Sequence, residues 1–116
     1  MTNNKEFIYH VISQIDWNQI SESEFYAPDS LTSEGFIHFS YKDQIPGVID
    51  RFYKNQTGLL VIKVDVNKLK SNLLLEKVPD TGLFPHLYGK LNLDAVVGVF
   101  QILKDENNKL FWSEGY

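Results

Sequence analysis

Residues 59–66 read Leu-Leu-Val-Ile-Lys-Val-Asp-Val, the most nearly continuous aliphatic run in the chain. Branched and aliphatic side chains favour an extended backbone, and a strand with so few polar residues is typical of one covered on both faces. We therefore predict that this stretch is the central strand of a sheet. A second aliphatic run, Ala-Val-Val-Gly-Val-Phe-Gln-Ile-Leu at residues 95–103, predicts another buried strand.

Shorter apolar segments predict the remaining strands. Residues 7–12 and 73–78 each form a short apolar run of strand length. Glu-Asn-Asn at 106–108 is typical of a turn, and it predicts a hairpin between the 95–103 strand and residues 110–112.

Two further stretches are rich in turn residues. Pro-Asp-Thr-Gly at 79–82 is a strong turn signal, and we expect 83–89 to follow as an ordered loop whose backbone is held by Pro85 and the neighbouring glycines. Residues 25–33 contain proline, aspartate, serine and threonine, and they predict a loop that leads into a turn at Gly35.

Two helices are predicted. Asp16 with Gln19 three residues later forms a capping-box pattern, which predicts a short helix over 17–23. Ser40 is the candidate N-cap of the second helix. The apolar residues of that helix recur at the spacing of one helical face, and they are Ile45, Val48, Ile49, Phe52 and Tyr53.

Strands outnumber helices in this pattern, and the helices come early. We therefore predict an α+β fold, with a curved, mostly antiparallel sheet and a few short helices packed on part of it. A chain of 116 residues is expected to form a single domain, 1–116.

Composition narrows the class of partner. The net charge is −4, and Arg51 is the only arginine, which argues against a surface that grips nucleic-acid phosphates. Cysteine is absent, so disulfide and thiolate chemistry are excluded. No apolar run is long enough to span a bilayer, and residues 1–6 lack the apolar core of a signal peptide. We expect a cytoplasmic protein that binds a small molecule, and we leave a protein partner open.

The stretch Ser-Glu-Gly-Phe-Ile-His-Phe-Ser at residues 33–40 holds the first candidate site. Side chains alternate along a strand, so Phe36, His38 and Ser40 share one face. A histidine and a hydroxyl thus point the same way from an apolar strand. This pair is predicted to form the floor of a cleft.

All three histidines have aromatic neighbours in the sequence: Tyr9 precedes His10, His38 lies between aromatic residues, and His86 lies in Phe-Pro-His-Leu-Tyr. Each is either a hydrogen-bonded core histidine or part of a ligand site. Their spacing lacks the close pairs typical of zinc ligands, so no metal site is predicted, although three histidines with a carboxylate remain an alternative.

Three carboxylates are candidates for a general base or a ribose contact: Glu34, Asp65 and Glu76. Asp and Glu are usually solvated surface charges, so each needs a second argument. Glu76 ranks first, because leucines precede it and the loop that carries His86 and Tyr88 follows it.

Several motifs together resemble a known family. They are Ile-Tyr-His at 8–10, Trp17, the segment 26–40 with Glu-Gly-Phe-Ile-His-x-Ser, and Phe-Pro-His-Leu-Tyr-Gly-x-Leu at 84–91. In this order they resemble a small bacterial and plant family of unknown function. Structures of that family are similar to the ADP-ribosyltransferase fold, a split, curved antiparallel sheet around an NAD cleft.

The resemblance implies roles for particular residues. His10 would hold a ribose hydroxyl of NAD, while His38 would contact a ribose or phosphate with support from Ser40. Our own hypothesis adds that His10 and His38 form the floor of the cleft, and that His86 and Tyr88 form one wall. NAD would be a substrate, and no covalently bound cofactor is implied.

The catalytic glutamate of the resembled fold has no counterpart in the 95–103 strand, where Gln101 is the only polar side chain. If the protein is an enzyme, we expect His38 to act with Glu76 or Glu34 as base. The reaction would be transfer or cleavage of ADP-ribose. The alternatives are a non-catalytic module that binds a small metabolite or a protein, and metal-assisted hydrolysis.

Overall fold

The computed structural model describes residues 6–113. Its strands are β1 (Phe7–Ser13), β2 (Phe25–Tyr26), β3 (Ile37–His38), β4 (Leu59–Asp65), β5 (Asn72–Val78), β6 (Gly82–Tyr88), β7 (Leu91–Asn92), β8 (Val96–Lys104) and β9 (Leu110–Trp112). Its α-helices are α1 (Gln14–Ile20), α2 (Asp29–Ser33) and α3 (Ile45–Phe52). None of the helices within 6–113 has the length and apolar character needed to cross a membrane.

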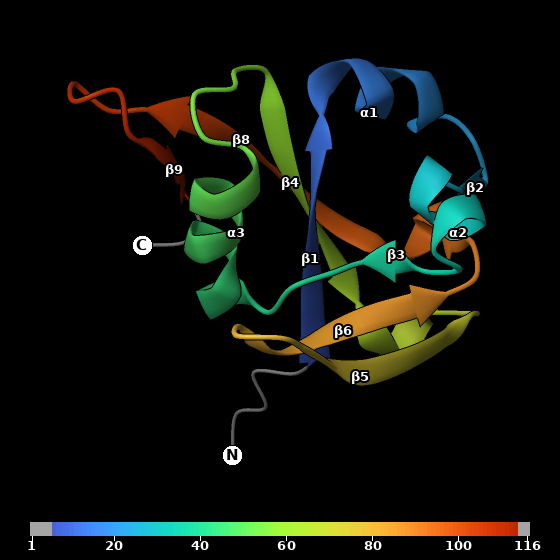
Figure 1. The fold of residues 1–116 in the computed structure, drawn as a ribbon. Coiled ribbons are helices and arrows are strands. Elements are labelled where there is room, and N and C mark those ends of the chain that lie inside the picture. Colours follow the sequence, from blue (N-terminus) through green and yellow to red (C-terminus); the bar gives the residue numbers. More distant parts are fainter. Residues whose placement is uncertain (1–5, 114–116) are drawn as a thin grey trace.

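The strands form three antiparallel groups. A four-stranded sheet has the order β1-β4-β8-β9, a three-stranded sheet has the order β3-β6-β5, and β2 pairs with β7 (Figure 1). The sheets curl into a half-barrel with the three short helices around it, so the predicted α+β class with a curved, mostly antiparallel sheet is confirmed.

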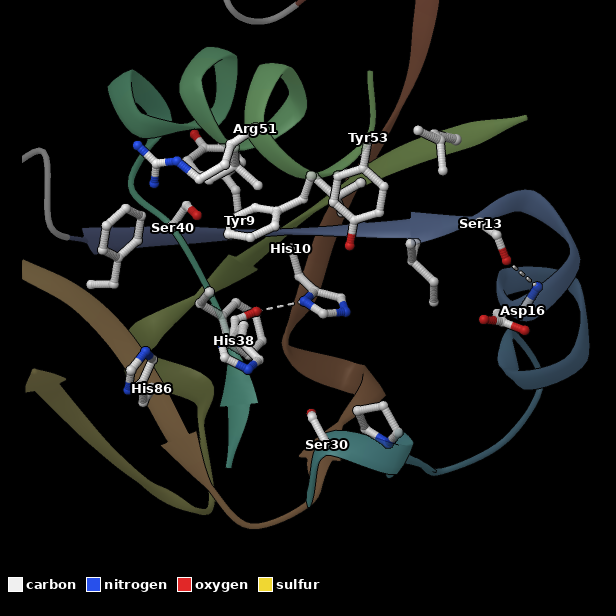
Figure 2. A pocket seen from close by; sticks show the side chains of 18 of the residues that line it. Tyr9, His10, Ser13, Asp16, Ser30, His38, Ser40, Arg51, Tyr53 and His86 are labelled. Atoms are coloured by element: carbon white, nitrogen blue, oxygen red, sulfur yellow. Dashed lines mark hydrogen bonds between the residues drawn. The ribbon is translucent and has the colours of Figure 1, made fainter. Parts of the chain in front are cut away.

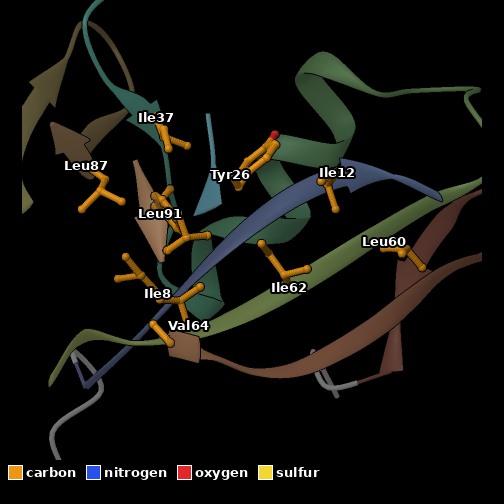
Figure 3. Close-up of a cluster of buried hydrophobic side chains, with 11 residues drawn as sticks. Ile8, Ile12, Tyr26, Ile37, Leu60, Ile62, Val64, Leu87 and Leu91 are labelled. Carbon is orange, nitrogen blue, oxygen red and sulfur yellow. The ribbon is translucent and has the colours of Figure 1, made fainter. Parts of the chain in front are cut away.

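Strand β4 lies between β1 and β8 and is covered on both faces, as predicted. Ile62 and Val64 point into one hydrophobic cluster together with the buried faces of β6 and β7 (Figure 3). Val61 points into a second cluster on the opposite face, which α3 covers. Because its neighbouring side chains serve two cores, β4 has almost no position for a polar residue.

Helix α3 has the predicted apolar face, with Ile45 and Ile49 buried in the second cluster. Two details of the prediction are wrong. Phe52 is 61% exposed, although it shares the apolar spacing. Ser40 does not cap the helix, because a 3₁₀ turn (Lys42–Gln44) comes first and the α-helix begins at Ile45.

The first helix begins earlier than predicted. Ser13, not Asp16, is the N-cap, and its hydroxyl accepts a hydrogen bond of 3.0 Å from the backbone N–H of Asp16. Helix α1 therefore directly continues β1. The predicted 25–33 loop is also wrong in part, since it contains β2 and α2.

The predicted loop 83–89 is instead strand β6, the middle strand of its sheet. Proline is tolerated at this position because its backbone groups face the β3 side of the strand and not the β5 side. The Pro85 carbonyl accepts a bond of 3.0 Å from the Phe39 N–H, so the missing proline N–H also faces the β3 side. Strand β3 has already ended at His38. The pairing of β6 with β5 is left intact.

Strand β8 is less buried than predicted, since one face is half-buried, with Ile102 its buried residue, and the other face is exposed. The side chains of Val97, Val99 and Leu103 point outward and are exposed. Its hairpin with β9 is present as predicted.

Gly89 lies between β6 and β7 with φ +146°, and an added Cβ would lie 2.5 Å from the Ser71 hydroxyl oxygen. We expect Gly89→Ala to lower the free energy of unfolding by roughly 2–4 kcal/mol, because the backbone strain and the clash add. Gly47→Ala in α3 is the control, since no atom lies within 4 Å of the added Cβ. It should stabilise the protein by about 0.5–1 kcal/mol. Urea denaturation measures both, and equal effects would contradict this reading of Gly89.

Candidate functional site

A cavity of about 640 Å³ lies along the outer edge of β1, between α3 on one side and α2, β3 and β6 on the other (Figure 2). The structure brings His10, His38, Ser40 and His86 to this cavity. These residues come from three separate parts of the sequence. Of the other candidates named from the sequence, Glu34, Asp65, Glu76 and Tyr88 do not line it.

The cavity exists because β1 is paired on its outer edge at one point only. Tyr9 and Ser40 exchange two backbone hydrogen bonds, of 2.7 and 2.8 Å. Backbone groups alternate sides along a strand, so the N–H and C=O of Val11 point to the same edge as those of Tyr9. Within residues 6–113 nothing bonds to that edge of Val11. The open edge faces the cavity, which Val11 also lines.

His10 is held by two protein partners. Its Nδ1 lies 2.6 Å from the His38 carbonyl oxygen and therefore carries the proton, while Nε2 lies 3.0 Å from the Tyr26 hydroxyl and accepts from it. Burial lowers the pKa of His10 to about 4, so the ring is neutral at pH 7. Burial also raises the pKa of Tyr26 well above its usual value.

This arrangement bears on the role that the resemblance implies for His10. Both ring nitrogens already have partners, so His10 does not present a free nitrogen to a ribose hydroxyl. The group next to it that can still accept a hydrogen bond is the Tyr26 oxygen, which also lines the cavity. His10 thus orients Tyr26 and fixes the β3 backbone.

His38 is exposed and bonds to the nearby carboxylate of Glu34. Its Nε2 lies 3.1 and 3.2 Å from the two oxygens of that carboxylate. Since Glu34 sits outside the cavity and already contacts His38, the structure gives it no direct path to a ligand bound there.

His86 is buried, and its Nδ1 lies 2.8 Å from a carboxylate oxygen of Glu76. The Tyr88 hydroxyl donates to the same oxygen at 2.6 Å. The bond from Tyr88, and then that from His86, holds the pKa of Glu76 below its usual value. Phe36 stacks on the His86 ring at 4.1 Å between centroids, and His38 meets that ring edge-on at 5.4 Å.

Charged groups lie toward different parts of the cavity. Arg51 lies toward Ser40, whereas Asp16 lies by Ser13 at the other end of the open β1 edge (Figure 2). No carboxylate among the described residues forms an ion pair with Arg51, which leaves its guanidinium available to an anion.

Sequence reasoning missed two of these features. In the sequence Arg51 stands out only as the single arginine. Its place three residues after Val48 puts both on one side of α3, and both line the cavity. The open Val11 edge had no sequence signal, because it depends on where the β3 segment leaves β1. In residues 6–113 no three His, Asp or Glu side chains come together to hold a metal, so the zinc alternative has no counterpart there.

The fold and site define an α+β half-barrel with a histidine-lined cleft at one sheet edge. Residues 11–99 match the family model described as "Protein of unknown function (DUF952)", and the chain belongs to this family. The match confirms the family of unknown function that the motifs resembled.

The fold is also found in a protein of known structure. The crystal structure of CC0527 from Caulobacter crescentus matches with a TM-score of 0.80 and 23% identity, over 90% of this chain and 93% of that one. Its solution NMR structure matches with a TM-score of 0.75 and 24% identity, over 89% and 90%. At this identity the likeness establishes the fold. A search of curated proteins gives no match.

The low pKa of His10 predicts a specific loss of stability in acid. The ring has a pKa near 6.5 when unfolded and about 4 when folded, so between these values the unfolded chain binds more protons. Stability should therefore be complete above pH 6.5 and fall by about 2–3 kcal/mol as the pH drops to 4.5. Urea denaturation of the wild type and of His10→Gln at pH 7.5 and 4.5 isolates this contribution. The same pH dependence in both proteins would contradict it.

Proposed function

We propose that the cavity binds NAD or a related nucleotide, and that the protein is an ADP-ribosyltransferase-like domain that transfers or cleaves ADP-ribose. The observation that carries the proposal is the open backbone edge of Val11, an N–H and a C=O side by side in a cavity lined by three histidines. Buried backbone groups are nearly always bonded, so this pair calls for a ligand with matching groups.

A primary carboxamide is that match. Its N–H donates and its C=O accepts along one edge, just as a neighbouring strand would. Nicotinamide carries such a group on a flat ring, and aromatic rings of Tyr9, Tyr26 and Tyr53 line the cavity around Val11. The proposal therefore places the nicotinamide end of the ligand on the β1 edge.

Arg51 supports a phosphate-bearing ligand. An unpaired guanidinium suits phosphate oxygens through two parallel N–H bonds. The Ser40 hydroxyl is in the same part of the cavity and can contact a phosphate or a ribose, and the Tyr26 oxygen can accept from a ribose hydroxyl. A volume of about 640 Å³ lies within the range of roughly 300–1,000 Å³ that is typical of small-molecule sites.

One observation favours the non-catalytic alternative. Neither glutamate proposed as a base, Glu34 or Glu76, lines the cavity. A passive module would bind the nucleotide without releasing nicotinamide. Incubation with NAD and chromatography of the products separates the two functions, since sustained release of nicotinamide requires catalysis.

Calorimetric titration with two dinucleotides tests the carboxamide contact without altering the protein. NAD should bind, and nicotinic acid adenine dinucleotide should bind at least about tenfold more weakly, because its carboxylate has no N–H to donate to the Val11 carbonyl. If the two dinucleotides bind with equal affinity, the carboxamide does not bind to the backbone groups of Val11. Absence of binding by either dinucleotide would overturn the proposed function.

Titration of two cation-deleting variants tests Arg51. We expect Arg51→Ala to weaken NAD binding about tenfold or more, because a charge-assisted contact to phosphate is lost. Lys54→Ala is the matched control, since Lys54 lies in the segment just after α3 but does not line the cavity. Equal losses in both variants would indicate general electrostatic attraction in place of a specific contact.

A further inference from the structure

We infer that His86, oriented by Glu76, is the proton acceptor of this site, with its Nε2 as the reacting atom. The inference rests on the proposed function and assigns a catalytic residue within it. It also changes the role of Glu76, which becomes a positioning residue that acts through His86 without touching the ligand.

The hydrogen bonds of His86 fix which nitrogen carries the proton. Glu76 accepts from the Tyr88 hydroxyl at 2.6 Å and has a lowered pKa, so it is an ionised carboxylate that can only accept. Nδ1 of His86, 2.8 Å from the same oxygen, must therefore be the protonated nitrogen. In the neutral form of the ring the lone pair is therefore on Nε2.

The surroundings hold this ring in one orientation. His86 is 6% exposed, its face is stacked on Phe36 at 4.1 Å, and its strand position is directly opposite His38. Within residues 6–113 its Nε2 has no hydrogen-bond partner, although the residue lines the cavity (Figure 2). A buried ring with one nitrogen anchored and the other unpaired is arranged to receive a proton from a bound molecule.

The chemical step balances with water as the only co-reactant. Nε2 takes a proton from a water molecule as the water oxygen bonds to the ribose carbon that carries nicotinamide. The carbon–nitrogen bond breaks, and its electron pair stays on the ring nitrogen, so the cationic nicotinamide group leaves as neutral nicotinamide. The products are ADP-ribose and an imidazolium, which Glu76 stabilises until it loses the proton to solvent.

Tautomer analysis by ¹⁵N NMR tests the geometry without any ligand. At pH 8 we expect His86 to show a protonated Nδ1 and a bare Nε2, and Glu76→Gln should raise the fraction of the other tautomer. Glu106→Gln is the matched control, because it removes an exposed carboxylate in the β8–β9 turn. A His86 ring protonated on Nε2 in the wild type would overturn the inference.

Kinetics of nicotinamide release then test the chemistry. We expect His86→Gln to lower kcat for NAD cleavage at least about 100-fold, and Glu76→Gln about tenfold, with NAD affinity within twofold of the wild type in both. Glu106→Gln should keep full activity. Should His86→Gln fail to fold, Glu76→Gln supplies the same comparison.

The outcomes separate the two proposals. If the protein binds NAD but releases no nicotinamide, the role of His86 is overturned and the nucleotide site is retained. The same conclusion follows if His86→Gln and Glu76→Gln leave the rate of nicotinamide release unchanged. A wild-type protein that does not bind NAD overturns the proposed function, and the assignment of this reaction to His86 falls with it.

Discussion

Two backbone hydrogen bonds between Tyr9 and Ser40 join the two main sheets of this protein. On one side of the crossing segment the N–H of Phe39 bonds to β6, and one residue later Ser40 bonds to β1. The segment therefore belongs to both sheets and fixes the distance between them. Because its backbone pairs with β1 at only one residue, the backbone groups of Val11 on the same edge remain open within residues 6–113. The cleft follows from this single point of attachment.

The sequence predicts the elements whose signal is repeated over many residues. The aliphatic run of β4 and the helical spacing of α3 each rest on several side chains that agree, so a single exception such as Phe52 does not alter the outcome. A prediction that rests on one residue is wrong when a neighbouring residue can take the same role. Ser13 and Asp16 can both cap a helix, and the choice depends on where β1 ends its pairing with β4. Pro85 favours a loop in the sequence, because proline is rare inside a sheet. It fits β6 because its nitrogen faces the β3 side, and the sequence does not show which neighbouring strand that nitrogen faces.

The candidate site shows the same division. Aromatic neighbours marked His10, His38 and His86, and the structure brings all three to one cavity. Which nitrogen of each ring is available could not be read from the sequence, because it is set by distant partners. Tyr26 lies 16 residues from His10, and Glu76 lies 10 residues from His86. Both ring nitrogens of His10 are hydrogen-bonded to the protein, whereas only Nδ1 of His86 is. His86 therefore has a nitrogen that can react with a ligand, and His10 does not.

The proline in β6 has a consequence for how the cleft meets a ligand. A proline nitrogen cannot donate a hydrogen bond under any condition, so the pairing of the β3 segment with β6 ends at the single bond from the Phe39 N–H to the Pro85 carbonyl. One residue later, at Ser40, the chain pairs with β1 instead. The proline thus fixes where this segment changes its partner strand from β6 to β1. No backbone pairing between strands has to break for a ligand to enter the cleft. Association should then occur as a near rigid-body fit, with little of its affinity spent on ordering the backbone.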